Sequence, residues 1–295
     1  MKFVKTKTIL TKVKYGNSWF GIDYNMNLYR GCMHGCIYCD SRSNCYHIEN
    51  FDIVRGKENA LSILEQELSK KKEKGVIGIG AMSDTYNPNE LKYEETRKAL
   101  KLILKYGFGV SIDTKSDLIM RDIDLLKEIN AKNNVIIKFT ITTPYDKQSK
   151  MIEPHVCVSS KRLAAIKTLS QNGIFVGILM NPVLPFITDK EEDIKELVRL
   201  AYENGAKFIY TYMGMTLREN QREYYFDKLE EHYLGLKEKY IKYYGNRYNC
   251  TVPNSKRLYK IFTEECDKYG ILYNMKDIIA AYKKEIKKSE QITLF

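Results

Sequence analysis

The stretch that decides the fold is residues 30–39, which read RGCMHGCIYC and place Cys32, Cys36 and Cys39 in one short loop. The spacing is C-x3-C-x2-C, and the aromatic Tyr38 stands directly before the last cysteine. Three thiolates this close together can bind three irons of a [4Fe–4S] cluster and leave the fourth iron open to a small molecule. The loop therefore predicts an iron–sulfur site with one free coordination position.

A structural zinc site is the alternative interpretation of this loop, with His34, Cys45 or His47 as the fourth ligand. Zinc sites more often use two C-x2-C pairs far apart in the sequence, and this chain has no second pair. A simple electron carrier would also need a fourth ligand, for which Cys45 is the candidate. A disulfide framework does not fit, because seven cysteines in 295 residues are sparse and odd in number.

Composition places the chain among globular proteins with a sizeable core. Hydrophobic residues make up 44% of the 295 residues, and no run approaches the ~20 apolar residues that a membrane span needs. The first five residues are too short and too charged for a secretory signal. We therefore expect a cytoplasmic protein with no membrane partner, in a reducing compartment where thiolates and clusters persist.

The net charge is +11, from 48 basic and 37 acidic residues. A basic balance favours nucleic acid or other anionic partners, which are held through phosphate contacts. The alternative is compositional drift, because the lysines are spread along the whole chain rather than concentrated in one segment. Charge alone leaves nucleic-acid binding open.

Strand-like and helix-like segments alternate through most of the chain, which predicts a parallel sheet with right-handed crossovers. About six β/α units are present, two short of a closed eightfold barrel. We expect an α/β fold: a partial (β/α)6 TIM-type barrel over residues 1–215, with additional C-terminal helices over residues 216–295 packed on it. The expected strands are 27–29, 76–80, 108–112, 135–141, 174–180 and 208–212. The expected helices are 58–72, 93–105, 121–130, 160–170 and 189–202, then 222–244, 255–269 and 277–288.

Polar residues follow the first four predicted strands. Parallel β/α sheets bind their ligands beyond the carboxyl ends of the strands, so these residues should meet at one site. They are the cysteine loop, Ser83 to Tyr86, Lys115 with Ser116, and Thr140 with Thr142. This convergence favours a catalytic cluster, because a zinc site that only stabilises the fold does not require it.

From about Asn27 to Tyr212, the chain resembles the radical S-adenosylmethionine (SAM) superfamily. Within it, the chain is similar to the spore photoproduct lyase-like group, also described as DNA repair photolyase-like. The segments that carry the resemblance are the loop Tyr29–Cys39, the D-x-Y-x-P-x-E-like box within Ser83–Glu90, Thr114–Ser116, Glu153-Pro154 and Asn181–Pro185.

The resemblance implies an enzyme in which Cys32, Cys36 and Cys39 bind a [4Fe–4S] cluster whose open iron chelates SAM. One electron, from a donor such as flavodoxin or ferredoxin, would cleave SAM to methionine and a 5′-deoxyadenosyl radical, which takes a hydrogen atom from a substrate. The substrate is unassigned, and a nucleic acid or nucleotide is the first candidate. The alternatives are a radical SAM enzyme acting on a peptide or small metabolite, and a nucleic-acid-binding protein with a structural metal site.

The resemblance also implies individual contacts with SAM. Tyr38 should pack near the adenine, Ser83 and Asp84 should contact the methionine or ribose portion, and Lys115 should pair with the carboxylate. Thr140 matches a polar cofactor contact in the group. No catalytic residue is assigned.

The chain departs from the group at one position. The lyase that names the group keeps a hydrogen-donating cysteine two residues before its Ser-Asp pair, where this chain has Ala81. Alanine cannot donate a hydrogen atom, so the chain is not a typical spore photoproduct lyase. Cys157 could supply a thiol from another direction, and its alternative is an incidental cysteine.

Overall fold

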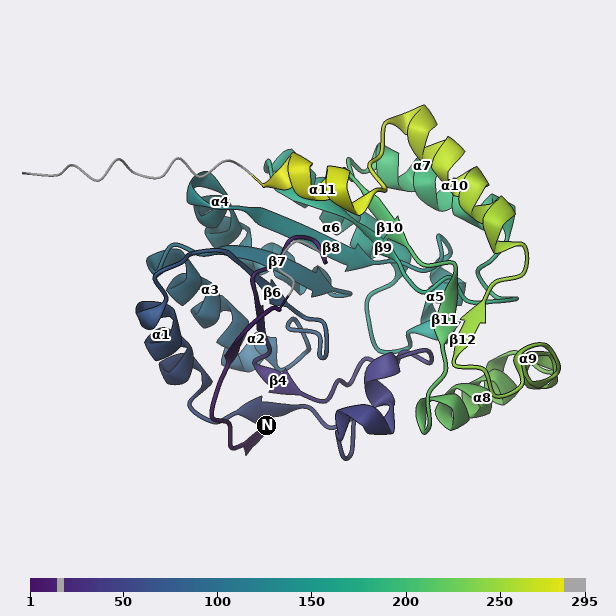
Figure 1. Ribbon diagram of the computed structural model, residues 1–295, viewed down its shortest axis with the longest axis horizontal. Coiled ribbons are helices and arrows are strands. Elements are labelled where there is room, and N and C mark those ends of the chain that lie inside the picture. Colours follow the sequence, from purple (N-terminus) through teal and green to yellow (C-terminus); the bar gives the residue numbers. More distant parts are fainter. Residues whose placement is uncertain (15–18, 284–295) are drawn as a thin grey trace, which may run out of the picture.

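The protein is described by a computed structural model covering residues 1–14 and 19–283. A seven-stranded sheet runs through its centre in the order β10-β9-β8-β7-β6-β3-β2 (Figure 1). Neighbouring strands from β3 to β10 are parallel, and β2 joins β3 antiparallel at one edge. The strands are β2 Leu10–Lys12, β3 Tyr24–Met26, β6 Val76–Ile79, β7 Gly109–Thr114, β8 Val135–Thr140, β9 Phe175–Met180 and β10 Ile209–Thr211.

Helices follow the parallel strands and cover the outside of the sheet (Figure 1). Every residue of β6 and β8 is buried, because one face of the sheet lies under these helices and the other lines the barrel interior. The amphipathic α3 illustrates the pattern, since it buries Thr96, Ala99, Leu100 and Ile103. The helices are α1 Ala60–Lys70, α2 Glu90–Tyr93, α3 Glu95–Lys105, α4 Ile123–Lys132, α5 Asp146–Ile152, α6 Ser159–Gln171 and α7 Glu191–Glu203.

Six parallel strands with their helices confirm the predicted partial (β/α)6 barrel. The prediction of its first strand was wrong in position. The strand in the main sheet is Tyr24–Met26, and Tyr29–Arg30 is β4 of a separate three-stranded sheet. In that sheet β4 pairs with β5 (Arg55–Lys57), and β5 pairs with β1 (Lys2–Val4). Such short strands leave too little periodicity for the sequence to reveal their partners.

The C-terminal part is helical, as expected, and includes a two-stranded sheet that was not predicted. The helix expected over 222–244 is two helices, α8 Gln221–His232 and α9 Leu236–Tyr244, because Gly235 between them has a φ of +78°. Helix α10 (Ser255–Tyr269) has the predicted bounds and packs on α7. Helix α11 is Met275–Tyr282, and the rest of the predicted helix, from residue 284, lies outside the described residues.

The predicted boundary between residues 1–215 and residues 216–295 falls within the strand β11 (Gly214–Thr216). This strand pairs antiparallel with β12 (Asn249–Thr251), so the helices α8 and α9 are joined to the barrel through this pair (Figure 1). The division into two parts stays a prediction.

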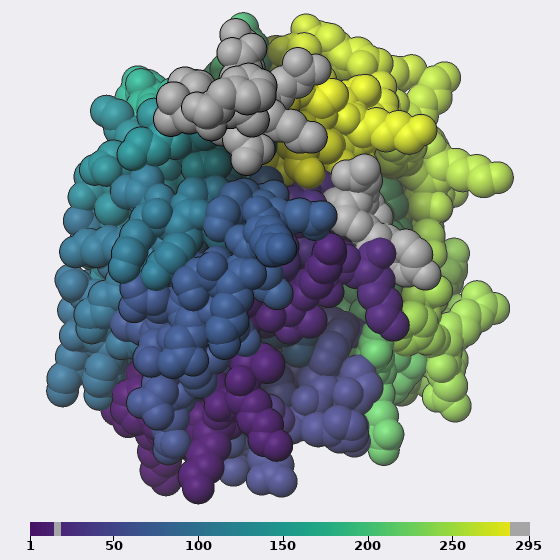
Figure 2. Space-filling view, turned by 60° about the vertical axis from the view of Figure 1, so that its left-hand side comes forward, coloured from purple at the N-terminus to yellow at the C-terminus, as the bar shows by residue number. Residues whose placement is uncertain are grey.

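The residues around Phe20 pack against the C-terminal helix α11. Phe20 lies with Ile278 and Tyr282 in one buried cluster, and the Tyr282 hydroxyl donates to the Phe20 carbonyl. In Figure 2 part of the purple N-terminal segment lies between the blue and the yellow residues, and the rest lies at the bottom of the view. Within the described residues, none of the helices combines the length and the apolar character that crossing a membrane requires.

Gly80 ends β6 with a φ of +101°, and a Cβ atom there would lie 2.1 Å from the Asp113 carbonyl oxygen. We predict that Gly80→Ala lowers the free energy of unfolding by several kcal/mol or prevents folding, because it adds a clash to backbone strain. Gly107→Ala is the control, since its φ is +72° and nothing lies within 4 Å of its Cβ position. The control should lose only about 1–2 kcal/mol. Urea unfolding measures both variants. If Gly80→Ala and Gly107→Ala lost the same free energy of unfolding, the close approach of β6 and β7 at Gly80 would not be required for stability.

Candidate active site

All eight predicted site residues line one cavity of about 320 Å³. The cavity lies at the carboxyl ends of the parallel strands: Gly80 directly follows β6, Thr114 is the last residue of β7, and Thr140 is the last residue of β8. Four segments far apart in the sequence therefore meet here, as the sequence predicted. The residues are Cys32, Cys36, Cys39, Tyr38, Ser83, Asp84, Lys115 and Thr140.

Backbone contacts hold the cysteine loop in place. The Cys32 N–H donates to the Phe51 carbonyl at 2.8 Å, and the Ser83 hydroxyl donates to the Gly31 carbonyl at 2.5 Å. Gly31 has a φ of +81°, and a Cβ there would lie 2.7 Å from the carbonyl oxygens of Phe51 and Ile53. Only glycine can adopt this conformation so close to the two carbonyl oxygens. The turn that directs the thiols toward the cavity therefore requires glycine immediately before the first cysteine.

The three cysteine side chains are free thiols that line the cavity. Three thiolates in one cavity can bind three irons of a [4Fe–4S] cluster and leave the fourth iron open. The cavity therefore brings together the ligands that a cluster of this kind needs.

Charged groups surround the thiols. Burial raises the pKa of Cys36 and Cys39, while the nearby Lys115 ammonium acts in the opposite direction. Burial also acts to raise the pKa of Cys32, but the hydrogen bond and charge of His34, together with backbone hydrogen bonds from Asp84 and His34, outweigh burial and bring that pKa below the usual value.

The carboxylate of Asp84 connects three of the segments that form the cavity. Its Oδ1 accepts from the Thr114 hydroxyl at 2.8 Å and from the Tyr86 N–H at 2.9 Å. Its Oδ2 accepts from the Lys115 N–H at 2.7 Å and lies 3.5 Å from Nδ1 of His34. Asp84 therefore fixes the end of β7 and the cysteine loop relative to β6. A direct contact with SAM stays a prediction.

Lys115 brings a positive charge to the cavity. Its ammonium lies 5.8 Å from the centre of the Tyr38 ring. Burial acts to lower its pKa, but the neighbouring Cys36, Glu153 and Asp84 outweigh burial and raise the pKa above the usual value. A lysine that stays protonated beside the cysteines is suited to bind a carboxylate.

A buried ion pair links Tyr38 to Thr140. The Tyr38 hydroxyl donates to Glu153, whose carboxylate lies 2.5 Å from Nη1 of Arg162. Arg162 also donates to the Thr140 carbonyl at 2.8 Å, and the side chains of Glu153 and Arg162 are at most 1% exposed. The pair therefore fixes two residues of the cavity wall from behind. Arg162 was not predicted, because α6 carries several other polar residues and its sequence does not reveal a buried partner for one of them.

The rest of the D-x-Y-x-P-x-E box does not enter this cavity. The Tyr86 hydroxyl donates to Asp122 at 3.1 Å, and Glu90 accepts from Arg121 at 3.0 Å and from the Tyr29 hydroxyl. The box therefore ties the loop after β6 to the loop after β7, and of its acidic and aromatic members only Asp84 lines the cavity.

Further residues line the cavity beside the eight, and among them Trp19, Asp113 and Asn181 were not predicted as site residues. Asp113 pairs with the buried Lys138 at 2.6 Å, and Lys138 also donates to the Ser111 hydroxyl at 2.8 Å. This pair could have been predicted from the sequence, because each of two neighbouring apolar strands carries one charged residue. The two residues are direct partners in the register of β7 and β8.

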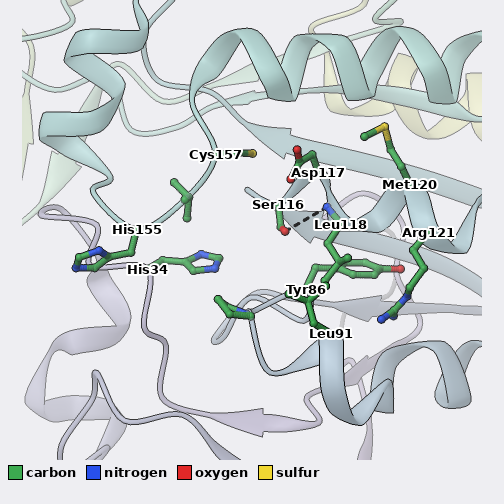
Figure 3. Close-up of a pocket in the computed structure, with 12 residues that line it drawn as sticks. His34, Tyr86, Leu91, Ser116, Asp117, Leu118, Met120, Arg121, His155 and Cys157 are labelled. Atoms are coloured by element: carbon green, nitrogen blue, oxygen red, sulfur yellow. Dashed lines mark hydrogen bonds between the residues drawn. The ribbon is translucent and has the colours of Figure 1, made fainter.

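A second cavity of about 520 Å³ lies beside the first and shares His34 with it (Figure 3). Cys157 lines this second cavity, and its thiol donates to the Lys115 carbonyl at 3.1 Å. It does not line the first cavity, so the structure gives no support to Cys157 as a hydrogen donor there. Ala81, at the position where the named lyase has its donor, does line the first cavity.

The family model of the radical SAM superfamily matches residues 26–201, more than half of the chain. An uncharacterized protein of Methanocaldococcus jannaschii is 36% identical over 179 residues, which are 60% of this chain and 66% of that protein. One of Mycobacterium tuberculosis is 26% identical over 228 residues, 75% of this chain and 67% of that protein. The chain thus spans about two thirds of the length of these relatives.

Solved structures of spore photoproduct lyase share the fold. A cysteine mutant of that enzyme has a TM-score of 0.64 and 18% sequence identity, over 88% of this chain and 78% of that chain. A double mutant with bound AdoMet and dinucleoside spore photoproduct has a TM-score of 0.64 and 16% identity, over 92% and 82% of the two chains. At these identities the similarity concerns the fold alone.

We predict that Asp84→Asn lowers the free energy of unfolding of the metal-free protein by about 1.5–3 kcal/mol, because the charge-assisted hydrogen bonds are lost. Asp227→Asn, on the exposed surface of α8, is the control and should change it by less than about 0.5 kcal/mol. Urea unfolding measures both. Indistinguishable midpoints and slopes for the two variants would contradict the positioning role of Asp84.

Proposed function

The chain belongs to the radical SAM superfamily, an enzyme family that uses a [4Fe–4S] cluster and S-adenosylmethionine, and we propose that it abstracts hydrogen from its substrate with a 5′-deoxyadenosyl radical. The observation that carries this proposal is the meeting of three free cysteines and a protonated lysine in one cavity. When bound, the cluster supplies the single electron that breaks the sulfonium bond. Methionine and the radical are the products, and the radical becomes 5′-deoxyadenosine when it takes the hydrogen atom.

The residues of the cavity have distinct proposed roles. Cys32, Cys36 and Cys39 hold the cluster and leave one iron free for SAM, because three thiolates bind only three of the four irons. Lys115 pairs with the carboxylate of SAM, and Asp84 acts mainly by fixing the backbone of Lys115.

The remaining contacts complete the SAM site. Tyr38 packs against the adenine, with its hydroxyl held by Glu153 so that the ring orientation is fixed. Ser83 contacts the methionine or ribose portion, and Thr140 supplies a further polar contact. These side chains are largely buried, which suits a reaction that stray water and other donors would quench.

We propose a nucleic acid or nucleotide as the substrate. The support is the net charge of +11 and the shared fold with spore photoproduct lyase, whose solved structure holds a dinucleoside photoproduct. Because Ala81 carries no thiol, the substrate radical would have to take its hydrogen atom from a different donor than the cysteine that the lyase uses. A peptide or small metabolite remains the alternative substrate class.

The electron would come from outside the chain. The four cysteines that do not line the cavity (Cys45, Cys157, Cys250 and Cys266) are also free, and none belongs to a metal-binding group in the described part of the chain. We propose a small electron-transfer protein such as flavodoxin or ferredoxin as the donor. A cytoplasmic location would suit such a donor and stays a prediction.

We predict that Cys36→Ala abolishes both the visible iron–sulfur absorption after anaerobic reconstitution and the formation of 5′-deoxyadenosine from SAM under dithionite. Cys45→Ser is the matched control, because Cys45 is exposed and lies outside the cavity. It should keep the absorption and the product. A colourless wild-type protein with one bound zinc would instead support a structural metal site.

We predict that Lys115→Met raises the dissociation constant for SAM at least about 10-fold, since a hydrogen bond to a charged group is worth about 1.5–3 kcal/mol. The iron content after reconstitution should not change. Equilibrium dialysis measures SAM binding, and Lys147→Met, exposed on α5, is the control. Unaltered SAM affinity in Lys115→Met would exclude the proposed pairing with the carboxylate.

A further inference from the structure

A small hollow lies behind the cysteine loop and shares a wall with the candidate active site. Its volume is about 150 Å³, and Met82 and Ser83 line both this hollow and the larger cavity. Arg30 and Lys57 also line it, and its lining includes no carboxylate. The hollow is therefore a compact site that two cations share directly beside the place proposed for SAM.

The two cations are close enough to affect one another. Burial lowers the pKa of Lys57, and the positive charge of Arg30 lowers it further. Glu67 acts in the opposite direction without outweighing them, and its carboxylate already accepts the N–H groups of Ile9 and Leu10. Two like charges held together without a carboxylate between them are stabilised by an anionic ligand.

Arg30 keeps donors available for such a ligand. One of its N–H groups donates to the His47 carbonyl, and a guanidinium carries five N–H donors in a planar fork. That fork matches the oxygens of a phosphate group, and Lys57 adds a point charge.

Aromatic and basic side chains continue from the hollow across the surface. Tyr46 lines the hollow, and the guanidinium of Arg218 lies 5.7 Å from the centre of its ring. Arg218 then donates to the Tyr248 hydroxyl at 2.7 Å and lies 5.0 Å from that ring, which is 44% exposed. Asp40 neutralises part of the Arg218 charge at 3.1 Å. Cations interleaved with aromatic faces are typical of surfaces that bind single-stranded nucleic acid.

We propose that Arg30 and Lys57 form a phosphate subsite for a single-stranded nucleic-acid substrate, with Tyr46, Arg218 and Tyr248 as the surface along which the strand continues. This inference rests on the substrate class proposed above. An acidic electron-transfer protein would also favour a basic surface. The small volume of the hollow, the half-buried Lys57 and the wall shared with the active site favour a single phosphate group instead.

The test measures how the affinity for a fluorescein-labelled single-stranded 12-mer depends on KCl concentration, by fluorescence anisotropy with the full-length protein. DNA and RNA probes are used in parallel. The slope of log K against log salt is about −0.7 for each phosphate contact with a single strand. The two side chains share one phosphate in this proposal, so the variant R30Q/K57Q should flatten the slope by about 0.7 and weaken binding at low salt. The control K161Q/K167Q, with the same loss of charge on exposed positions of α6, should retain the wild-type slope.

Two further measurements keep the outcomes separate. The single variant R30Q changes an exposed side chain and should give half of the slope change, so a folding defect at Lys57 cannot hide the effect. Equal slopes for R30Q/K57Q and the α6 control would overturn the subsite. So would a wild-type protein that cleaves SAM but binds neither probe, and in that case the radical chemistry would stand. One other outcome would assign the hollow to an electron donor instead. In that case R30Q/K57Q would bind both probes as the wild type does, and its cluster would be reduced by dithionite but no longer by flavodoxin.

Discussion

The site depends on the carboxylate of Asp84, which receives hydrogen bonds from the end of β7 and from the loop after β6, and which also faces His34 in the cysteine loop. Parallel strands bring their carboxyl ends to one edge of a sheet, but they do not fix the loops that follow. One buried acceptor with two oxygens can connect three such loops, because each oxygen accepts more than one donor. The position of Lys115 relative to the three thiols follows from this connection.

Two buried ion-pair networks support the cavity from outside. Glu153 and Arg162 lie behind Tyr38 and Thr140, while Glu90, Arg121 and Asp122 join the loops after β6 and β7. Buried ion pairs contribute little net stability, since removing two charges from water offsets their attraction. We interpret both networks as positioning the cavity walls. The first contacts Tyr38 and Thr140, which line the cavity, and the second joins the loops that carry Asp84 and Lys115.

Much of the architecture could be predicted from the sequence, because long apolar runs alternate with amphipathic helices and repeat six times. The candidate site could be predicted for a related reason: its polar residues directly follow those runs. What could not be predicted depends on distant contacts. The pairing of Tyr29–Arg30 with Arg55–Lys57 involves strands too short to show a period, and the break at Gly235 looks like any glycine within a helical pattern. The role of Arg162, in the mixed sequence of α6, is explained only by its partner Glu153. Lys138 stands out as the one charged residue of the apolar β8, but its partner Asp113 lies on another strand.

The central claim is that the three cysteines hold a cluster with one iron open to SAM. The most direct measurement is electron paramagnetic resonance of the reconstituted protein after reduction, with SAM labelled isotopically in its carboxylate. The account predicts a reduced-cluster signal that changes shape when SAM is added and shows coupling to the labelled nucleus. A signal that SAM leaves unchanged would contradict it, since all four irons would then be closed to the cofactor.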